Sequence, residues 1–182
     1  MFKLLVFYGL FSALSIQQLK LVKTKIDDRI IVYLPEEFFT VPEMEIASKY
    51  ISYRDPLAVF TDMSTRVDFA VNNSMTRWRL SDIELMKSFY KANIPTLYDK
   101  LEFIREDIET INNRQFVVFE FISTLLPNEN SIRNNPPEIK YNYIQYTIVK
   151  GETLLFNFNA PASLKDKWEG TASEIMHSIT IK

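Results

Sequence analysis

Cysteine and histidine, the side chains that most often act as nucleophiles, bases and metal ligands, are almost absent from this sequence. Its 182 residues include no cysteine and one histidine, His177. The lack of cysteine excludes disulfide bonds, thiolate zinc sites, cysteine nucleophiles and lipid-modified cysteines. We therefore expect no metal site and no cofactor.

His177 is the one residue type here that commonly serves as a general base. A serine triad would need it to orient a serine, yet no G-x-S-x-G elbow or other nucleophile motif is present. His177 stands beside Ser178 near the end of an expected terminal helix. We interpret it as a partly buried helix-end residue stabilised by the helix dipole. The sequence thus favours a non-enzymatic protein over an enzyme.

Adjacent acidic residues could in principle bind calcium or form the acid/base pair of a glycosidase. Neighbouring residues on a strand point to opposite faces, and no D-x-D-x-D spacing is present. We interpret all three pairs as solvated surface charge: Asp27-Asp28, Glu36-Glu37 and Glu106-Asp107.

The segment Arg77-Trp78-Arg79 is the most promising binding patch. Arginine forks bind carboxylates or phosphates, and tryptophan adds contact area. The alternative is that Trp78 packs beneath a helix start while both arginines are solvated. A second candidate contact is Arg133, in the polar segment from Pro127 to Pro137, which is rich in Asn and Pro like a partner-binding loop or a plain connector.

Charge and composition exclude some partners. The chain carries 21 Lys and Arg against 23 Asp and Glu, a formal charge of -2, and 47% of its residues are hydrophobic. This balance offers no general attraction to nucleic acid, and only three glycines leave no glycine phosphate loop. The length suits a single domain with a sizeable core.

The N-terminus is typical of a signal peptide. Lys3 precedes an apolar run at residues 4–16, and Ala13 and Ser15 are small residues suited to cleavage between Ser15 and Gln17. We predict that residues 1–17 are a signal peptide and 18–182 a single domain, exported to the periplasm or outside the cell if the source is bacterial. A buried element of the fold is the alternative. A membrane span is disfavoured, because it needs about 20 apolar residues.

Periodic patterns predict an α+β protein: an antiparallel sheet flanked by helices in an α/β/α layered sandwich. Tight turns at Asn112-Asn113 and Lys150-Gly151 should join hairpins, and Phe116 to Ile122 should be a central strand covered on both faces. Expected strands are Ile30–Leu34, Ala58–Thr61, Val67–Asn72, Ile104–Ile111, Gln115–Thr124, Tyr141–Val149 and Thr153–Phe158.

Two helices are expected. Ser81 and Glu84 form an S-x-x-E start for the first, whose apolar stripe extends to Leu97 and Leu101, with a break near Asn93 before Pro95. Ser163 and Asp166 are the expected caps of the second, whose buried positions are Leu164, Trp168, Ala172, Ile175 and Met176.

This order of elements resembles the PsbP-like superfamily, which includes the photosystem II extrinsic protein and the Ran-binding nuclear import factor. Tyr50 to Asp62 (YISYRDPLAVFTD), running into Val67 to Asn72, is similar to the family segment that enters a strand hairpin. Gly151 to Pro161 (GETLLFNFNAP), followed by a helix closing on Ile175 to Ile179, is similar to its last hairpin and helix. Cystatin-like folds are the competitor. The resemblance implies a partner-binding or assembly-assisting role and carries over no site residue.

Two function classes follow. The first is an exported, non-enzymatic binding or assembly-assisting protein with a protein partner, contacted through Arg77, Trp78, Arg79 and Arg133. The second is a small-ligand carrier or cryptic hydrolase that uses an aromatic-lined pocket between the sheet and the first helix. A concave pocket with polar groups near His177 or Tyr141 to Tyr146 would favour the second class, and a solid core would reject it.

Overall fold

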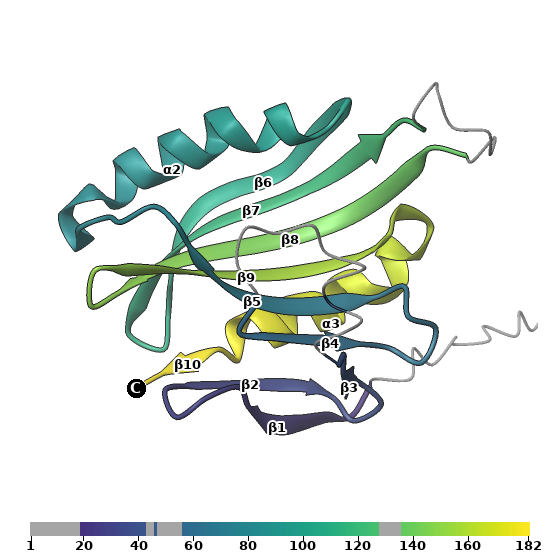
Figure 1. Cartoon of the computed structure of the whole chain (residues 1–182), viewed down its shortest axis with the longest axis horizontal. Coiled ribbons are helices and arrows are strands. Elements are labelled where there is room, and N and C mark those ends of the chain that lie inside the picture. The colour runs from purple at the N-terminus through teal and green to yellow at the C-terminus, as the bar shows by residue number, and fades with distance from the viewer. Residues whose placement is uncertain (1–18, 43–45, 47–55, 128–135) are drawn as a thin grey trace, which may run out of the picture.

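The computed structural model describes residues 19–42, 46, 56–127 and 136–182 (Figure 1). The predicted signal peptide, residues 1–17, lies outside the described residues, and so do Arg133 and the central part of the segment from Pro127 to Pro137. Among the described residues, no helix has the length and apolar character needed to cross a membrane.

The main element is a seven-stranded antiparallel sheet with the strand order β3-β4-β5-β9-β8-β7-β6. A second, three-stranded sheet has the order β1-β2-β10. The strands of the large sheet are β3 (Phe39–Thr40), β4 (Ala58–Thr61), β5 (Asp68–Ser74), β6 (Lys100–Ile111), β7 (Arg114–Leu125), β8 (Glu138–Val149) and β9 (Glu152–Pro161). Those of the small sheet are β1 (Leu21–Lys25), β2 (Ile30–Pro35) and β10 (Thr180–Ile181).

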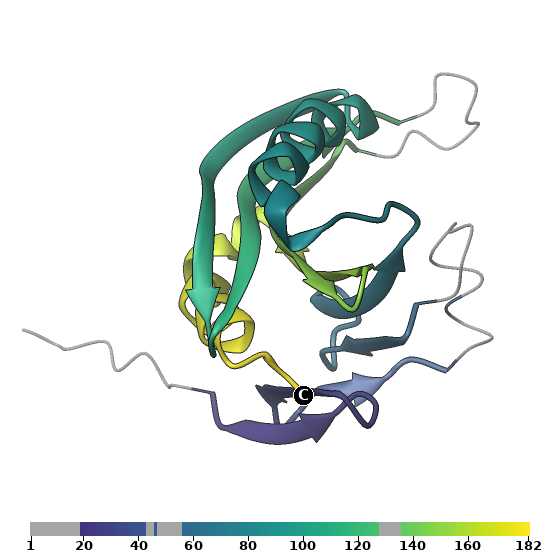
Figure 2. The same ribbon diagram turned by 90° about the vertical axis from the view of Figure 1, so that its left-hand side faces the viewer.

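Helices α2 (Ile83–Asn93) and α3 (Lys165–His177) cover opposite faces of the large sheet (Figure 1). Figure 2 shows the bend of the sheet around α2. The small sheet packs on α3 from the other side, since Ile30, Val32 and Leu34 share a buried cluster with Trp168. The predicted α+β layered sandwich is confirmed.

Strand β7 is apolar on both faces because both are covered, although it is the second strand from the edge of the sheet and not the central one as predicted. Val117 and Phe119 lie in the α2-side cluster, and Phe116 and Val118 lie in the α3-side cluster. All four are at most 1% exposed, which confirms the prediction for Phe116 to Ile122. Glu120 is the exception, and its partners are described below.

Two predicted hairpin turns are confirmed by backbone angles that few residues other than glycine and asparagine adopt readily. Asn112 and Asn113 have φ of 48° and 64°, between β6 and β7. Lys150 and Gly151 have φ of 51° and 81°, between β8 and β9. The hairpin of β4 and β5 is confirmed as well.

The predicted S-x-x-E cap at the start of the first helix is wrong. Leu80–Asp82 form a 3-10 turn, and α2 begins at Ile83. The Ser81 hydroxyl donates to Oδ1 of Asp82 at 2.9 Å, and the Arg79 N–H donates to Oδ2 at 3.3 Å. The Asp82 carboxylate therefore takes the place in the turn that the sequence assigned to the Ser81–Glu84 pair.

The predicted end of α2 near Asn93 is confirmed, but the predicted extension of its apolar stripe to Leu97 and Leu101 is wrong. The helix ends at Asn93, before the 3-10 turn Ile94–Leu97 that contains Pro95. The apolar stripe does not continue, because Leu97 is 66% exposed and Leu101 belongs to β6.

The second helix also lacks the predicted caps. A 3-10 turn, Ala162–Leu164, precedes α3, whose N-cap is Leu164 without a side-chain hydrogen bond, so Ser163 and Asp166 do not cap it. Its buried face is confirmed for Trp168, Ala172, Ile175 and Met176. Strand β1 was missed, because Lys20 to Arg29 looks too charged for a strand.

Candidate functional site

The segment Arg77 to Arg79 joins β5 to the 3-10 turn before α2. Trp78 is half-buried and packs edge-on against Phe89 of α2, with ring centroids 5.4 Å apart. Arg77 and Arg79 are exposed. The structure therefore places Trp78 against the outer flank of α2 and leaves Arg77 and Arg79 exposed on either side of it in the chain.

Contacts reaching into the core fix this segment. Phe89 packs on Tyr90 with centroids 5.3 Å apart, and Tyr90 stacks on Tyr146 of β8 at 3.7 Å. The Tyr90 hydroxyl forms hydrogen bonds of 2.8 Å and 2.6 Å with the hydroxyls of Ser74 and Thr76. The start of the loop is thus tied to the core through Tyr90, and the Trp78 ring is positioned by its contact with Phe89.

The exposed side of α2 carries two large apolar side chains. Leu85 is 61% exposed and lies one turn before Phe89, which is 38% exposed. Residues four apart lie on the same helix face. We call Arg77, Trp78, Arg79, Leu85 and Phe89 together the α2 surface. Among the described residues, neither Arg77 nor Arg79 forms an ion pair.

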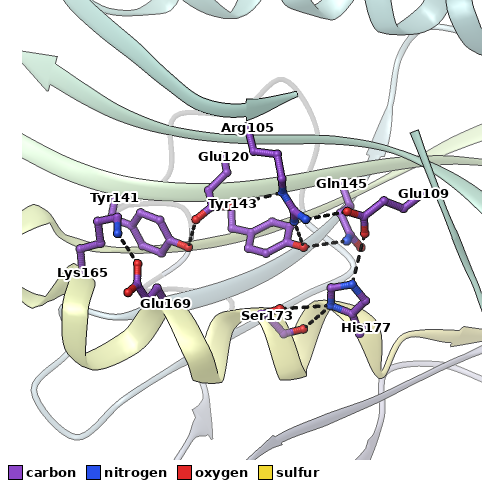
Figure 3. A network of polar contacts seen from close by, with 10 residues as sticks. All are labelled: Arg105, Glu109, Glu120, Tyr141, Tyr143, Gln145, Lys165, Glu169, Ser173 and His177. Atoms are coloured by element: carbon purple, nitrogen blue, oxygen red, sulfur yellow. Dashed lines mark hydrogen bonds and ion pairs between the residues drawn. The ribbon is translucent and has the colours of Figure 1, made fainter. Parts of the chain in front are cut away.

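A second polar region, the α3 network, lies between α3 and strands β6, β7 and β8 (Figure 3). Its centre is Arg105 on β6, which donates to Oε1 of Glu109 at 2.6 Å and to the Tyr143 hydroxyl at 2.5 Å. Arg105 also lies 3.5 Å from Oε2 of Glu120. The Tyr141 hydroxyl donates to the other oxygen of Glu120 at 2.8 Å.

Burial and neighbouring charges fix the protonation of this network. Burial, together with the hydrogen bond to Glu120, raises the pKa of Tyr141 well above its ordinary value. Burial raises the pKa of Tyr143 as well, although Arg105 opposes that effect. For Arg105 itself, burial lowers the pKa, but Tyr143, Glu109 and Glu120 together raise it. Both tyrosines are therefore neutral and Arg105 is charged at ordinary pH.

His177 joins the network as the last residue of α3, the helix-end position that the sequence predicted. Its Nε2 lies 3.2 Å from Oε2 of Glu109, and its side chain is 45% exposed, so just over half of it is buried. A lysine–glutamate ion pair lies at the other end of α3, where Lys165 contacts Glu169 and its ammonium group lies over the Tyr141 ring.

Ser173, His177 and Glu109 lie in a line like that of a catalytic triad (Figure 3). The Ser173 hydroxyl is 3.3 Å from Nδ1 of His177. However, Nδ1 is closer, at 2.7 Å, to the Ser173 carbonyl, which can only accept a hydrogen bond. Nδ1 must therefore carry a proton and cannot take one from the hydroxyl, so this line of residues does not activate a serine.

The predicted aromatic-lined pocket between sheet and helix is filled by side chains, since Tyr90, Tyr146, Phe119 and Phe121 pack in one cluster. Two cavities lined by described residues lie elsewhere. One, of about 250 Å³, is lined by Leu19, Lys20, Pro35, Glu36 and Glu37, and the other, of about 60 Å³, by Asn73, Ser74, Met75, Arg77 and Glu152. Within the part of the chain that the structure describes, no three acidic or histidine side chains gather to bind a metal ion.

Comparison with known proteins shows which solved structures share this fold. No protein-family model and no curated protein matches the sequence. The structure is similar to that of CyanoP, the cyanobacterial PsbP of Synechocystis sp. PCC 6803, with a TM-score of 0.61 and 16% identity over 95% of this chain and 99% of that one. The chain has the PsbP-like fold. The predicted resemblance is confirmed at this level.

Two further structures share this fold. LpqN of Mycobacterium tuberculosis, described as involved in cell envelope biogenesis, has a TM-score of 0.58 and 11% identity, with 90% and 91% of the two chains covered. The Ran-binding protein Mog1p of Saccharomyces cerevisiae has a TM-score of 0.56 and 13% identity, with 90% and 96% covered. These identities establish the fold and not a shared function.

Sequence reasoning named Arg77, Trp78 and Arg79 but missed Leu85, Phe89 and the whole α3 network. One signal for the network was available: Glu120 is the only charged residue in the apolar run Phe116 to Ile122, and a buried carboxylate requires a partner. Nothing in the sequence indicated that the partner is Arg105, since a bulge between Phe103 and Arg105 sets which residues of β6 face α3.

Proposed function

We propose that this protein is an exported, non-enzymatic binding protein that holds a protein partner at the α2 surface. The observation that carries the proposal is the Trp78–Phe89 pair, which is partly exposed, flanked by Leu85 and anchored to the core through Tyr90. Pre-organised aromatic side chains beside arginine are typical of the residues that dominate binding energy in protein interfaces.

The charges favour an acidic partner segment. Arg77 and Arg79 have no ion-pair partner among the described residues, whereas the chain as a whole has a net charge of -2. A partner that presents carboxylates beside apolar side chains would pair with the guanidinium groups while covering Leu85 and Phe89. Arg133 remains a predicted further contact.

The α3 network offers less to a partner. Its carboxylates, guanidinium and tyrosine hydroxyls bind one another, so most of their hydrogen-bonding capacity is used within the protein. Binding-type relatives agree with a non-enzymatic role: one structure of this fold is named a Ran-binding protein, and another is linked to cell envelope biogenesis.

The interaction test uses the natively expressed protein with Arg77, Trp78 and Arg79 all replaced by alanine. We expect a protein that co-purifies with the wild type to be lost from this variant. The matched control replaces Met63, a 77% exposed residue in the β4–β5 turn, by alanine, and should retain the partner. Retention of the same partner by the triple variant would contradict the proposal.

Export is tested separately, by intact mass and compartment fractionation of the native protein. We expect a loss of about 15 to 17 N-terminal residues and recovery outside the cytoplasm. A full-length cytosolic product would contradict export without affecting the docking proposal, which would then concern an intracellular partner.

A further inference from the structure

Strand β6 is the last strand of the large sheet and pairs only with β7 among the described strands. It has 12 residues, as many as β7, so it presents a long margin of backbone (Figure 1). The free edge of a sheet carries N–H and C=O groups that can pair with a further strand. Some proteins bind extended segments of their partners along such an edge.

Hydrogen bonds show which backbone groups of β6 point outward. The Gln115 carbonyl of β7 accepts a bond from the Thr147 hydroxyl of β8 at 2.8 Å, so it points away from β6. Because backbone groups alternate in direction along a strand, Val117 points the same way, and its partner Ile108 has its own groups directed outward. In agreement, the Ile108 N–H donates to Oδ1 of the preceding residue, Asp107, at 2.7 Å.

The same alternation directs the backbone groups of Glu106 and Thr110 outward, on either side of Ile108. These residues follow the β-bulge between Phe103 and Arg105, so their register with β7 is regular. A strand added along this part of β6 would therefore meet a continuous row of outward N–H and C=O groups.

The side chains beside this edge differ between the two faces of the sheet. On the face covered by α2, Phe103 and Ile108 are half-buried at the margin of the α2-side cluster, so part of their apolar surface is uncovered. On the α3 face, Glu102 and Asp107 are exposed and form no ion pair with a described residue. An added strand would point alternate side chains to the two faces, so alternating apolar and cationic residues would complement both.

A second copy of β6 fits this edge poorly. Antiparallel pairing of two copies centred on Asp107 sets their two Asp107 carboxylates opposite each other, and a centre at Ile108 sets Asp107 opposite Glu109. Like charges in these positions are destabilising. An incoming strand must also draw the Asp107 carboxylate away from the Ile108 N–H, and a lysine or arginine at the facing position does so by pairing with it.

We propose that the outer edge of β6 binds an extended segment of a partner protein in which apolar residues alternate with lysine or arginine. The segment continues the large sheet as a further strand, with its apolar side chains beside Phe103 and Ile108 and its cations beside Glu102 and Asp107. Backbone hydrogen bonds supply affinity and the alternating side chains supply specificity. This edge is separate from the α2 surface, and the inference does not rest on the proposed function.

The test titrates the purified full chain with a short synthetic peptide of alternating valine and lysine in about 0.15 M salt, followed by NMR and amide hydrogen exchange. We expect saturable binding that slows the exchange of the Ile108 and Thr110 amide protons. The matched peptide with glutamate in place of lysine should bind about tenfold more weakly. A valine–lysine peptide N-methylated at alternate residues keeps its charge but lacks backbone donors, and should not slow the exchange.

Ile108→Pro tests the backbone of the edge. Proline lacks the N–H that points outward, and the bonds from β6 to β7 remain because this N–H takes no part in them. The variant should weaken binding of the valine–lysine peptide by about tenfold and abolish the slowed exchange at Thr110. If Ile108→Pro does not fold, the N-methylated peptide decides the same question on the unchanged protein.

Glu102→Gln combined with Asp107→Asn tests the charges, because both replacements keep the shape of the side chain. This double variant should weaken binding by about fivefold. The matched control, Glu37→Gln combined with Glu84→Gln, removes two exposed carboxylates away from the edge and should leave binding unchanged.

Four results would overturn the inference. The first is the absence of saturable binding of the valine–lysine peptide. The second is equal slowing of exchange by the N-methylated peptide, which would show attraction by charge alone. The third is an equal loss of binding in the two double variants. The fourth is self-association of the chain that protects the Ile108 amide without any peptide, since the edge would then belong to a second copy.

Discussion

The two helices are attached to the same sheet in opposite ways. Helix α2 is held by an aromatic stack and presents Leu85 and Phe89 on its outer side. Helix α3 is held by Trp168 in the core and by a network of charges and hydroxyls at its margin. Most polar groups of the α3 network bind one another, although Nε of Arg105 is buried without a hydrogen-bond acceptor among the described residues, whereas the α2 surface leaves apolar area and two arginines available. Because of this contrast, we assign a structural role to the α3 network and propose a binding role for the α2 surface.

The two tryptophans give the largest expected difference. Trp168 of α3 is 1% exposed and packs on Phe158 of β9, so Trp168→Ala should cost about 3–5 kcal/mol of unfolding free energy. Trp78→Ala removes mainly its contact with Phe89 and should cost about 1 kcal/mol. Urea unfolding monitored by circular dichroism measures both, and equal losses would break the comparison.

The α3 network gives the next largest effect. Arg105→Met leaves Glu109 and Glu120 close together without their cation, and should cost about 2 kcal/mol. Adding Glu109→Gln should recover part of this loss, which a double-mutant cycle quantifies. The control on the α2 side is Lys91→Met, which breaks an exposed pair with Glu106 and should cost below about 1 kcal/mol. A larger cost for Lys91 than for Arg105 would contradict the account.

Alkaline pH should affect both sides through tyrosine. Burial raises the pKa of Tyr141 and Tyr143 on the α3 side and of Tyr98 and Tyr146 on the α2 side. A raised pKa in the folded state means that this stability is present below the unfolded value of about 10 and is lost as pH rises toward the folded value.

Absorbance at alkaline pH follows the ionisation of these four tyrosines. We expect these four to stay un-ionised near pH 10 until the protein unfolds, and Tyr141→Phe to reduce the loss of stability above that pH. Ionisation of all nine tyrosines at one ordinary pKa in the folded protein would show that neither side is packed as described.

The smallest effect on stability is expected at the α2 surface. Leu85→Ser changes a 61% exposed side chain and should alter the unfolding free energy by less than about 0.5 kcal/mol. If Leu85 were instead part of the core, the loss would match that of buried helix residues. Thermal unfolding of the variant beside Met86→Ser, whose side chain is fully buried, makes the distinction.

The sequence predicted the parts of the fold that local physics decides. The Asn112-Asn113 and Lys150-Gly151 turns require positive φ, and the apolar run Phe116 to Ile122 requires cover on both faces. The caps at Ser81 and Ser163 were wrong because 3-10 turns precede both helices, which no local pattern announced.

The functional regions depend on contacts between distant residues. Arg105 and Tyr143 are 38 positions apart in the chain, and a β-bulge places them together. Trp78 could be named as a contact residue from its type. Its contact with Phe89 could not be predicted, because the 3-10 turn before α2 determines which side of the helix faces Trp78. The outward backbone groups of β6 likewise follow only once the register of β6, β7 and β8 is known.

The central claim is that the α2 surface is a docking surface for a protein. Its most direct test places a photo-crosslinking side chain at Leu85 in the native host, with the more exposed Met63 as the comparison site. The account predicts one discrete protein adduct at Leu85 that disappears when Arg77 and Arg79 are both replaced by glutamate, and no such adduct at Met63. Identical adducts at the two positions, or an adduct at Leu85 that survives both charge reversals, would contradict it.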